Sequence, residues 1–127
     1  MKRRRVFVDG TFLRALVDEG DPRHGAARAA FAPLLDAYER GDALLYSDAA
    51  AVAAAEEPRT LDVMRPGRLL AVRRATRRDA TRLVARRAEL RLDQAVTLVL
   101  LRRHQIAEIA TFDPLYEGFD VGVIGAT

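Results

Sequence analysis

Three aspartates occupy positions from which a fold could bring their carboxylates together. Asp9 directly follows a short apolar run, Asp113 follows a second such run, and Asp93 lies in the first turn of an expected apolar helix. Carboxylates that crowd together repel one another, and a hard divalent cation such as Mg²⁺ relieves this repulsion through oxygen ligands. A metal held in this way can activate water and stabilise charge on a phosphate that is being cleaved. The three acids therefore predict a magnesium-dependent site for phosphodiester hydrolysis.

The charge distribution predicts a basic surface that such a substrate would need. Residues 65–91 contain ten arginines and two acidic residues, a net charge of +8, whereas the rest of the chain holds 11 basic and 16 acidic residues, a net charge of −5. Like charges four residues apart destabilise an isolated helix, so a row of them favours an anionic partner, either nucleic acid or an acidic protein segment. The alternative is a solvated face in an arginine-rich protein. Four arginines form such a row and are the candidates for nucleic-acid binding: Arg74, Arg78, Arg82 and Arg86.

Short apolar runs alternate with helical patterns along the chain. We expect strands at residues 4–8, 43–46, 69–72, 108–111 and 121–124, and helices at about 12–17, 22–40, 48–57, 76–90 and 92–104. This alternation predicts an α/β fold, a three-layer α/β/α sandwich around a central, mainly parallel sheet of four or five short strands. Functional groups in such sheets lie beyond the carboxyl ends of the strands, which is where Asp9 and Asp113 fall. The length predicts a single domain over residues 1–127.

Several classes of protein are excluded or disfavoured by composition. The absence of cysteine excludes disulfides and thiolate metal sites. Lys2 is the only lysine, so the later lysine of receiver domains and aspartyl-phosphate phosphatases is missing, as is the GxxxxGK motif of a P-loop. No apolar run approaches the roughly 18 residues of a membrane span. We therefore expect a soluble, cytoplasmic protein without a membrane partner.

Both ends of the chain resemble the PIN domain family. VFVDGT at residues 6–11, followed by LRAL, resembles the opening of a PIN domain, and residues 91–124 resemble its closing half. In that half an Asp begins an apolar helix, and a strand about 20 residues later ends in Thr-x-Asp followed by an aromatic residue. Asp93, Thr111, Asp113 and Tyr116 match this pattern. The resemblance covers essentially the whole chain in element order, although its motifs occupy only the two ends.

The resemblance implies a Mg²⁺- or Mn²⁺-dependent endoribonuclease with a PIN-like fold. In small bacterial members of the family this activity belongs to the toxin of a VapBC-type toxin–antitoxin pair, which implies an RNA substrate, an antitoxin protein and a homodimer. Carried over residue by residue, Asp9, Asp93 and Asp113 become metal ligands. Thr11 and Thr111 become supporting hydroxyls that orient the acids or a bound water. A housekeeping nuclease without an antitoxin is a weaker alternative.

One position departs from the pattern of the family. The family places a Glu about six residues after the Ser or Thr that ends the second strand; counted from Ser47, this position is Ala53. Glu56 and Glu57 follow one turn later, and Glu57 lies closer to the expected direction, about 40° away against about 60° for Glu56. Either Glu57, which we favour, or Glu56 is the fourth catalytic acid, or the site lacks it. The second possibility implies a degenerate PIN-fold module that binds RNA or protein without cleaving it.

The remaining polar candidates are expected to have structural roles. Asp48 is interpreted as a helix cap. His24 and His104 stand near a helix start and a helix end, where surface or capping roles are expected, so no histidine general base is predicted.

Overall fold

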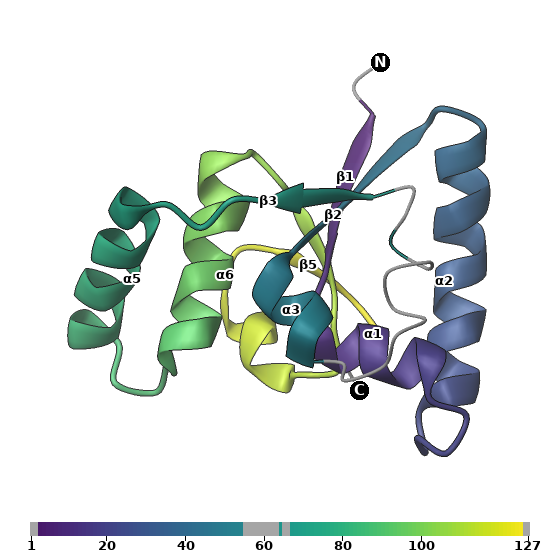
Figure 1. Cartoon of the computed structure of the whole chain (residues 1–127), viewed down its shortest axis with the longest axis horizontal. Helices are drawn as coiled ribbons and strands as arrows, with labels where there is room; N and C mark the ends of the chain where they lie inside the picture. The colour runs from purple at the N-terminus through teal and green to yellow at the C-terminus, as the bar shows by residue number, and fades with distance from the viewer. Residues whose placement is uncertain (1–2, 55–63, 65–66, 126–127) are drawn as a thin grey trace.

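A central parallel sheet organises the computed structural model, which describes residues 3–54, 64 and 67–125 (Figure 1). Within this part of the chain five strands pair in the order β3-β2-β1-β4-β5, and every pairing is parallel. The strands are β1 (Arg4–Val8), β2 (Ala43–Asp48), β3 (Arg68–Leu70), β4 (Glu108–Ala110) and β5 (Gly122–Ile124). The predicted parallel α/β sheet is therefore confirmed, and the strand that carries Asp9 at its carboxyl end lies in the middle of it.

The helices follow the expected order, with shifted boundaries. They are α1 (Gly10–Val17), α2 (His24–Glu39), α3 (Ala49–Ala54), α5 (Arg74–Arg86), α6 (Leu92–Arg103) and a 3₁₀ helix, η1 (Pro114–Gly118). The predicted helix 76–90 was too long at its end, because a turn from Arg87 to Leu90 buries Leu90 between α5 and α6. The predicted strand 43–46 was too short, because Ser47 and Asp48 continue β2. Residues 55–57 of the third predicted helix lie outside the described residues.

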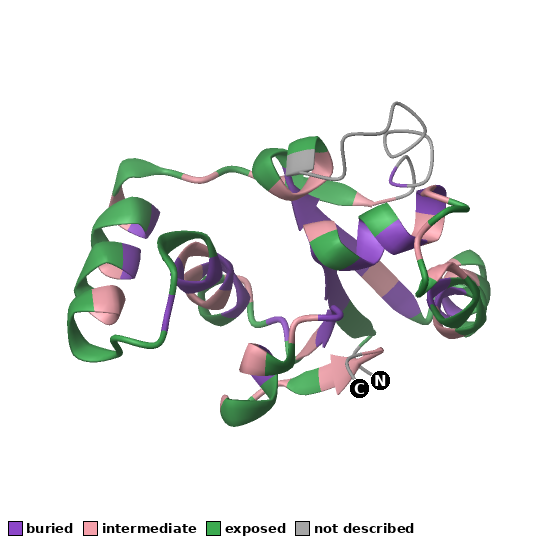
Figure 2. Ribbon diagram, turned by 90° about the horizontal axis from the view of Figure 1, so that it is seen from below, coloured by how far each residue is buried: buried purple, intermediate pink, exposed green. Residues whose placement is uncertain are grey.

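Both faces of the sheet are covered, as the alternation of side chains along β1 requires. Val6 and Val8 point to one face, where they pack with Phe12 and Leu13 of α1 and with side chains of α2. Phe7 points to the other face, where it packs with Leu100 and Leu101 of α6. The sheet thus lies between α1 and α2 on one side and α6 on the other, with residues 6–8 of its central strand buried (Figure 2). This confirms the predicted three-layer sandwich.

Helix α5 is the outermost element on the α6 side. It packs against α6 through a small apolar cluster that contains Ala80, Leu90 and Ala95, and its arginines remain exposed. In Figure 1 it stands at the edge of the molecule, separated from the sheet by α6. None of the helices in the described ranges is long and apolar enough to cross a membrane.

The strand β4, which lies between β1 and β5, gives a test of this packing. Ile109 is fully buried, so Ile109→Ala should lower the free energy of unfolding by about 2–5 kcal/mol, because it removes apolar contacts and leaves a cavity. Leu69 of the edge strand β3 is 51% exposed. Leu69→Ala should therefore change the free energy of unfolding by no more than about 0.5 kcal/mol. Urea denaturation followed by circular dichroism measures both, and equal losses would contradict the described core.

Candidate active site

Four carboxylates line one cavity of about 440 Å³ at the carboxyl ends of the central strands. Asp9 follows β1, Asp48 ends β2, Asp93 lies in the first turn of α6, and Asp113 stands between β4 and η1. The structure thus brings the three predicted aspartates together and adds a fourth. A site beyond the carboxyl ends of parallel strands is the arrangement expected for this class of fold.

Asp9 is buried beside the cavity and is held there by three hydrogen bonds. Its Oδ1 accepts hydrogen bonds from the Thr11 hydroxyl at 2.7 Å and from the Phe12 backbone N–H at 3.0 Å, and its Oδ2 accepts one from the Thr111 hydroxyl. Burial raises the pKa of the Asp9 carboxyl, and these three hydrogen bonds oppose the rise. The negative charge of Asp113 adds a smaller upward contribution to the same pKa. Asp9 therefore caps α1 and also faces the cavity, so the two roles are compatible.

The two threonines connect the acids to the backbone. Thr11 accepts a hydrogen bond from the Phe112 N–H, and Thr111 accepts one from the Asp113 N–H, each at 2.9 Å. Both hydroxyls also donate to Asp9. The threonines thereby fix Asp9 relative to the segment that carries Asp113, which is the arrangement that a supporting role requires.

Asp113 and Asp93 are held by neighbours that the sequence did not single out. The Gln94 amide donates to Asp113 Oδ2 at 2.7 Å, while its carbonyl accepts the Arg91 N–H at 2.9 Å. The Arg91 guanidinium donates to both oxygens of Asp93, at 3.1 and 3.3 Å, and lies 3.7 Å from Asp113 Oδ2. Only the position of Gln94 in the first turn of a helix could have indicated a bonding role. Its partner 19 residues later could not be read from the sequence.

Asp48 has a second role beyond the predicted cap. Its Oδ1 accepts the Ala51 N–H at 2.7 Å, so it does cap α3, and it is also buried against the acidic cavity. Burial raises the pKa of the Asp48 carboxyl, and hydrogen bonds from the backbone of Ala51 and Ala50 oppose the rise. The available signal was its place just after the apolar run ALLY and Ser47, close to the rule that singled out Asp9. Ala53 is an exposed residue of α3, and Glu56 and Glu57 lie outside the described residues.

The other predicted residues lie away from the cavity or have structural bonds. His24 Nδ1 bonds the Ala15 carbonyl at 2.8 Å, and His104 is the C-cap of α6, so both occupy helix ends as expected. The cavity is lined by three arginines, Arg14, Arg77 and Arg91. None of the predicted row Arg74, Arg78, Arg82 and Arg86 lines it; Arg82 and Arg86 line a separate groove instead.

The chemistry of the cavity suits a hard cation, although its side chains are otherwise engaged. In the described part of the chain no three Asp, Glu or His side chains are placed to hold a metal ion. Arg91 pairs with Asp93 and Asp113, and Thr11 and Thr111 bond Asp9. Carboxylate oxygens are nevertheless the ligands that Mg²⁺ and Mn²⁺ take, and four of them face one cavity. A bound cation would have to replace the Arg91 guanidinium beside Asp93 and Asp113.

Comparison with known proteins identifies the fold. No family model matches the chain, and no curated protein matches it in sequence. Among solved structures, the crystal structure of VapC20 from Mycobacterium tuberculosis, a toxin that cleaves the sarcin-ricin loop, matches 94% of this chain and 98% of its own, with a TM-score of 0.72 and 18% identity. The chain has the fold of a VapC toxin. The PIN-like fold predicted from the two end motifs is therefore confirmed, and at this identity the likeness to VapC20 extends to the fold alone.

Removal of the buried charge at Asp9 should change how stability depends on pH. Because the folded-state pKa of Asp9 is raised, the folded state binds the proton more tightly, and ionisation of Asp9 destabilises the fold as pH rises. In metal-free protein, the melting temperature of Asp9→Asn relative to wild type should therefore increase from acidic to neutral pH. Scanning calorimetry with EDTA from pH 4 to pH 8 measures this difference, and a difference that decreases over this range would contradict it.

The ion pairs of Arg91 predict an effect on metal binding. Arg91→Gln should bind Mn²⁺ a few-fold more tightly, because the cation no longer has to displace a guanidinium from Asp93 and Asp113. The affinity for Mn²⁺ can be measured without RNA from the electron paramagnetic resonance signal of the free ion. Arg14→Gln is the matched control, since Arg14 lines the same cavity but makes no ion pair with a described residue. Weaker Mn²⁺ binding in Arg91→Gln, or an equal gain in both variants, would count against this role of Arg91.

Proposed function

We propose that this protein is a single-domain endoribonuclease dependent on Mg²⁺ or Mn²⁺, the toxin of a VapBC-type pair, acting in the cytoplasm. The observation that carries the proposal is the meeting of four carboxylates in one cavity, on the fold of a VapC toxin. Three arginines line the same cavity, so groups that could hold a cation and groups that could hold a phosphate lie side by side.

The proposed division of labour follows the bonds in the cavity. Asp9, Asp93 and Asp113 would hold the metal, and Asp48 and Glu57 are the further acids that could complete its coordination. When bound, the metal supplies an activated water and charge stabilisation on the scissile phosphate. Thr11 and Thr111 hold Asp9 and the segment of Asp113 in place relative to each other through the bonds described above, and Gln94 sets the orientation of Asp113.

The RNA would approach over the basic side of the molecule. Arg14, Arg77 and Arg91 surround the cavity and are the groups placed to bind phosphates beside the acids. The exposed arginines of α5, Arg74, Arg78, Arg82 and Arg86, extend the positive charge beyond it, and we propose that they attract RNA over a longer range. Binding that depends on such contacts weakens steeply as salt is added. An antitoxin protein and a second copy of the chain are the remaining proposed partners.

A second candidate function is a degenerate PIN-fold module that binds RNA or protein without cleaving it. Two observations favour it: Ala53 stands where the family has its Glu, and the carboxylates of the described residues do not form a ready-made metal site. The module would retain the arginines around the cavity and lose only the reaction.

A cleavage assay separates these functions. An RNA hairpin with the sarcin-ricin loop sequence is the first substrate to try, because VapC20 cleaves that loop. Cleavage should require Mn²⁺ or Mg²⁺, stop with EDTA, and fall at least about 10- to 100-fold in Asp113→Asn. Asp36→Asn, on the exposed side of α2, should cleave like wild type.

Each outcome of the assay is informative. Cleavage that survives both EDTA and Asp113→Asn would come from a contaminant. RNA binding without cleavage of this hairpin or of total RNA, with either metal, would contradict the nuclease proposal and favour the binding module.

A further inference from the structure

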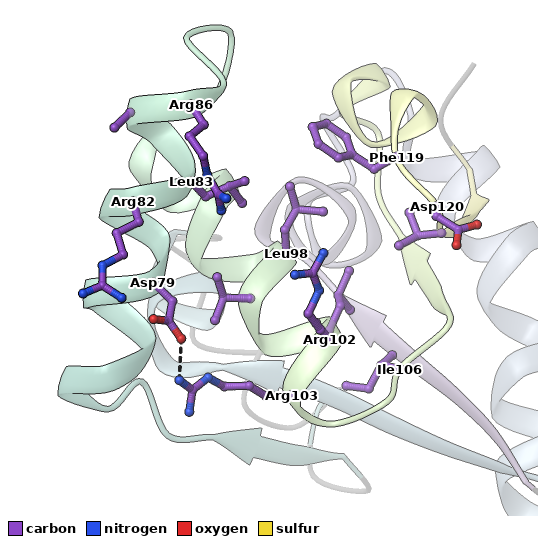
Figure 3. A pocket seen from close by; sticks show the side chains of 14 residues that line it. Asp79, Arg82, Leu83, Arg86, Leu98, Arg102, Arg103, Ile106, Phe119 and Asp120 are labelled. Carbon is purple, nitrogen blue, oxygen red and sulfur yellow. Dashed lines mark hydrogen bonds and ion pairs between the residues drawn. The ribbon is translucent and has the colours of Figure 1, made fainter.

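A second cavity lies on the opposite side of α6 from the acidic one. It is a groove of about 780 Å³ between α5, α6 and the segment that leads from η1 into β5 (Figure 3). The two cavities share no residue: Val96 and Thr97 of α6 face the acids, whereas Leu98 and Arg102 face the groove. A ligand in the groove would therefore not touch the proposed nuclease site.

The floor of the groove is apolar and incompletely covered. Leu83 of α5, Leu98 of α6 and Phe119 after η1 are half-buried side chains of the cluster that joins α5 to α6. Ile106 and Val121 continue this floor toward the sheet. Apolar side chains from three separate elements thus meet around one opening, where a further apolar surface would gain free energy by excluding water.

Arginines surround this floor. Arg103 is neutralised by Asp79, with Nη2 and Oδ2 2.6 Å apart. The other arginines that line the groove, Arg82, Arg86 and Arg102, form no ion pair with any described residue. In Figure 3 the side chains of Arg86 and Arg102 reach toward the space between α5 and Phe119. Asp120 also lines the groove, so its four arginines outnumber its two aspartates, and an apolar floor is combined with a net positive charge.

This combination favours an acidic protein segment over nucleic acid. A phosphate backbone gains nothing from leucine side chains, and bases bind such surfaces by stacking on exposed aromatic faces. The Phe119 ring, the one aromatic group that lines the groove, already has the Arg87 guanidinium over it, 4.7 Å from the ring centroid. An amphipathic segment can instead place apolar side chains on the floor and carboxylates at the rim.

We propose that the groove between α5, α6 and η1 binds an acidic amphipathic segment of a partner protein. Apolar side chains of the segment pack on Leu83, Leu98 and Phe119, and its carboxylates pair with Arg86 and Arg102. The proposal concerns a surface outside the acidic cavity, so it stands or falls independently of nuclease activity.

A designed peptide can test this binding on the full chain. The probe is a fluorescein-labelled helical peptide with leucines at positions i, i+3, i+4 and i+7 and glutamates on both flanks. Its controls are a scrambled peptide of equal composition and charge and a labelled 12-nucleotide RNA. Anisotropy should show that the striped peptide binds more tightly than the scrambled one. The charge reversal Arg86→Glu/Arg102→Glu should weaken its binding at least about tenfold.

The matched control lies on the same helix α5. Arg74→Glu/Arg78→Glu makes the same change in net charge at two positions that do not line the groove. It should leave peptide binding within about twofold of wild type. If circular dichroism shows that the groove double variant is unfolded, Arg86→Gln/Arg102→Gln replaces it, with Arg74→Gln/Arg78→Gln as its control. Equal binding of striped and scrambled peptides, or equal losses in the two double variants, would overturn the proposal. So would a groove-specific loss of RNA binding with unchanged peptide binding.

Discussion

The buried carboxylate of Asp9 is the constraint around which the acidic cavity is arranged. It accepts hydrogen bonds from Thr11 and Phe12 at the start of α1 and from Thr111 after β4, so one charged group joins two parts of the chain that are far apart in sequence. A buried charge is tolerated only where such bonds compensate for lost hydration. Because Thr111 also bonds the backbone of Asp113, the geometry that satisfies Asp9 positions the second acid as well.

Helix α6 contacts the acidic cavity, the sheet and the groove. Its first turn provides Asp93, which lines the acidic cavity, and Gln94, which bonds Asp113. In its last turns Leu100 packs on the sheet with Phe7, and Leu98 and Arg102 form one wall of the groove. Successive residues of an α-helix point in directions about 100° apart. The 12 residues of α6 can therefore contact the acidic cavity, the sheet and the groove at the same time. The two cavities are therefore separate in their lining residues and joined through one rigid element.

The sequence predicted the contacts that depend on local pattern and missed those that depend on distant partners. The parallel sheet and the placement of Asp9 and Asp113 followed from strand-end patterns. Asp48 was assigned only a capping role, because two polar residues after ALLY suggested that the strand had ended. In the structure the Ser47 hydroxyl donates to the Val8 carbonyl of β1, 39 residues away, so a polar residue is satisfied inside the sheet. The bridging roles of Gln94 and Arg91, and the groove beside α5, likewise depend on contacts between elements that no local pattern reveals.

The position of β1 at the centre of the sheet also has a consequence for biosynthesis. One neighbour of β1, the strand β2, begins at Ala43, but the other, β4, begins only at Glu108. During translation Asp9 leaves the ribosome about a hundred residues before Thr111 and Asp113, so the cavity can assemble only after these residues have emerged. For a chain proposed to cut RNA, this order keeps the acids apart until the segment that carries Asp113 has been made.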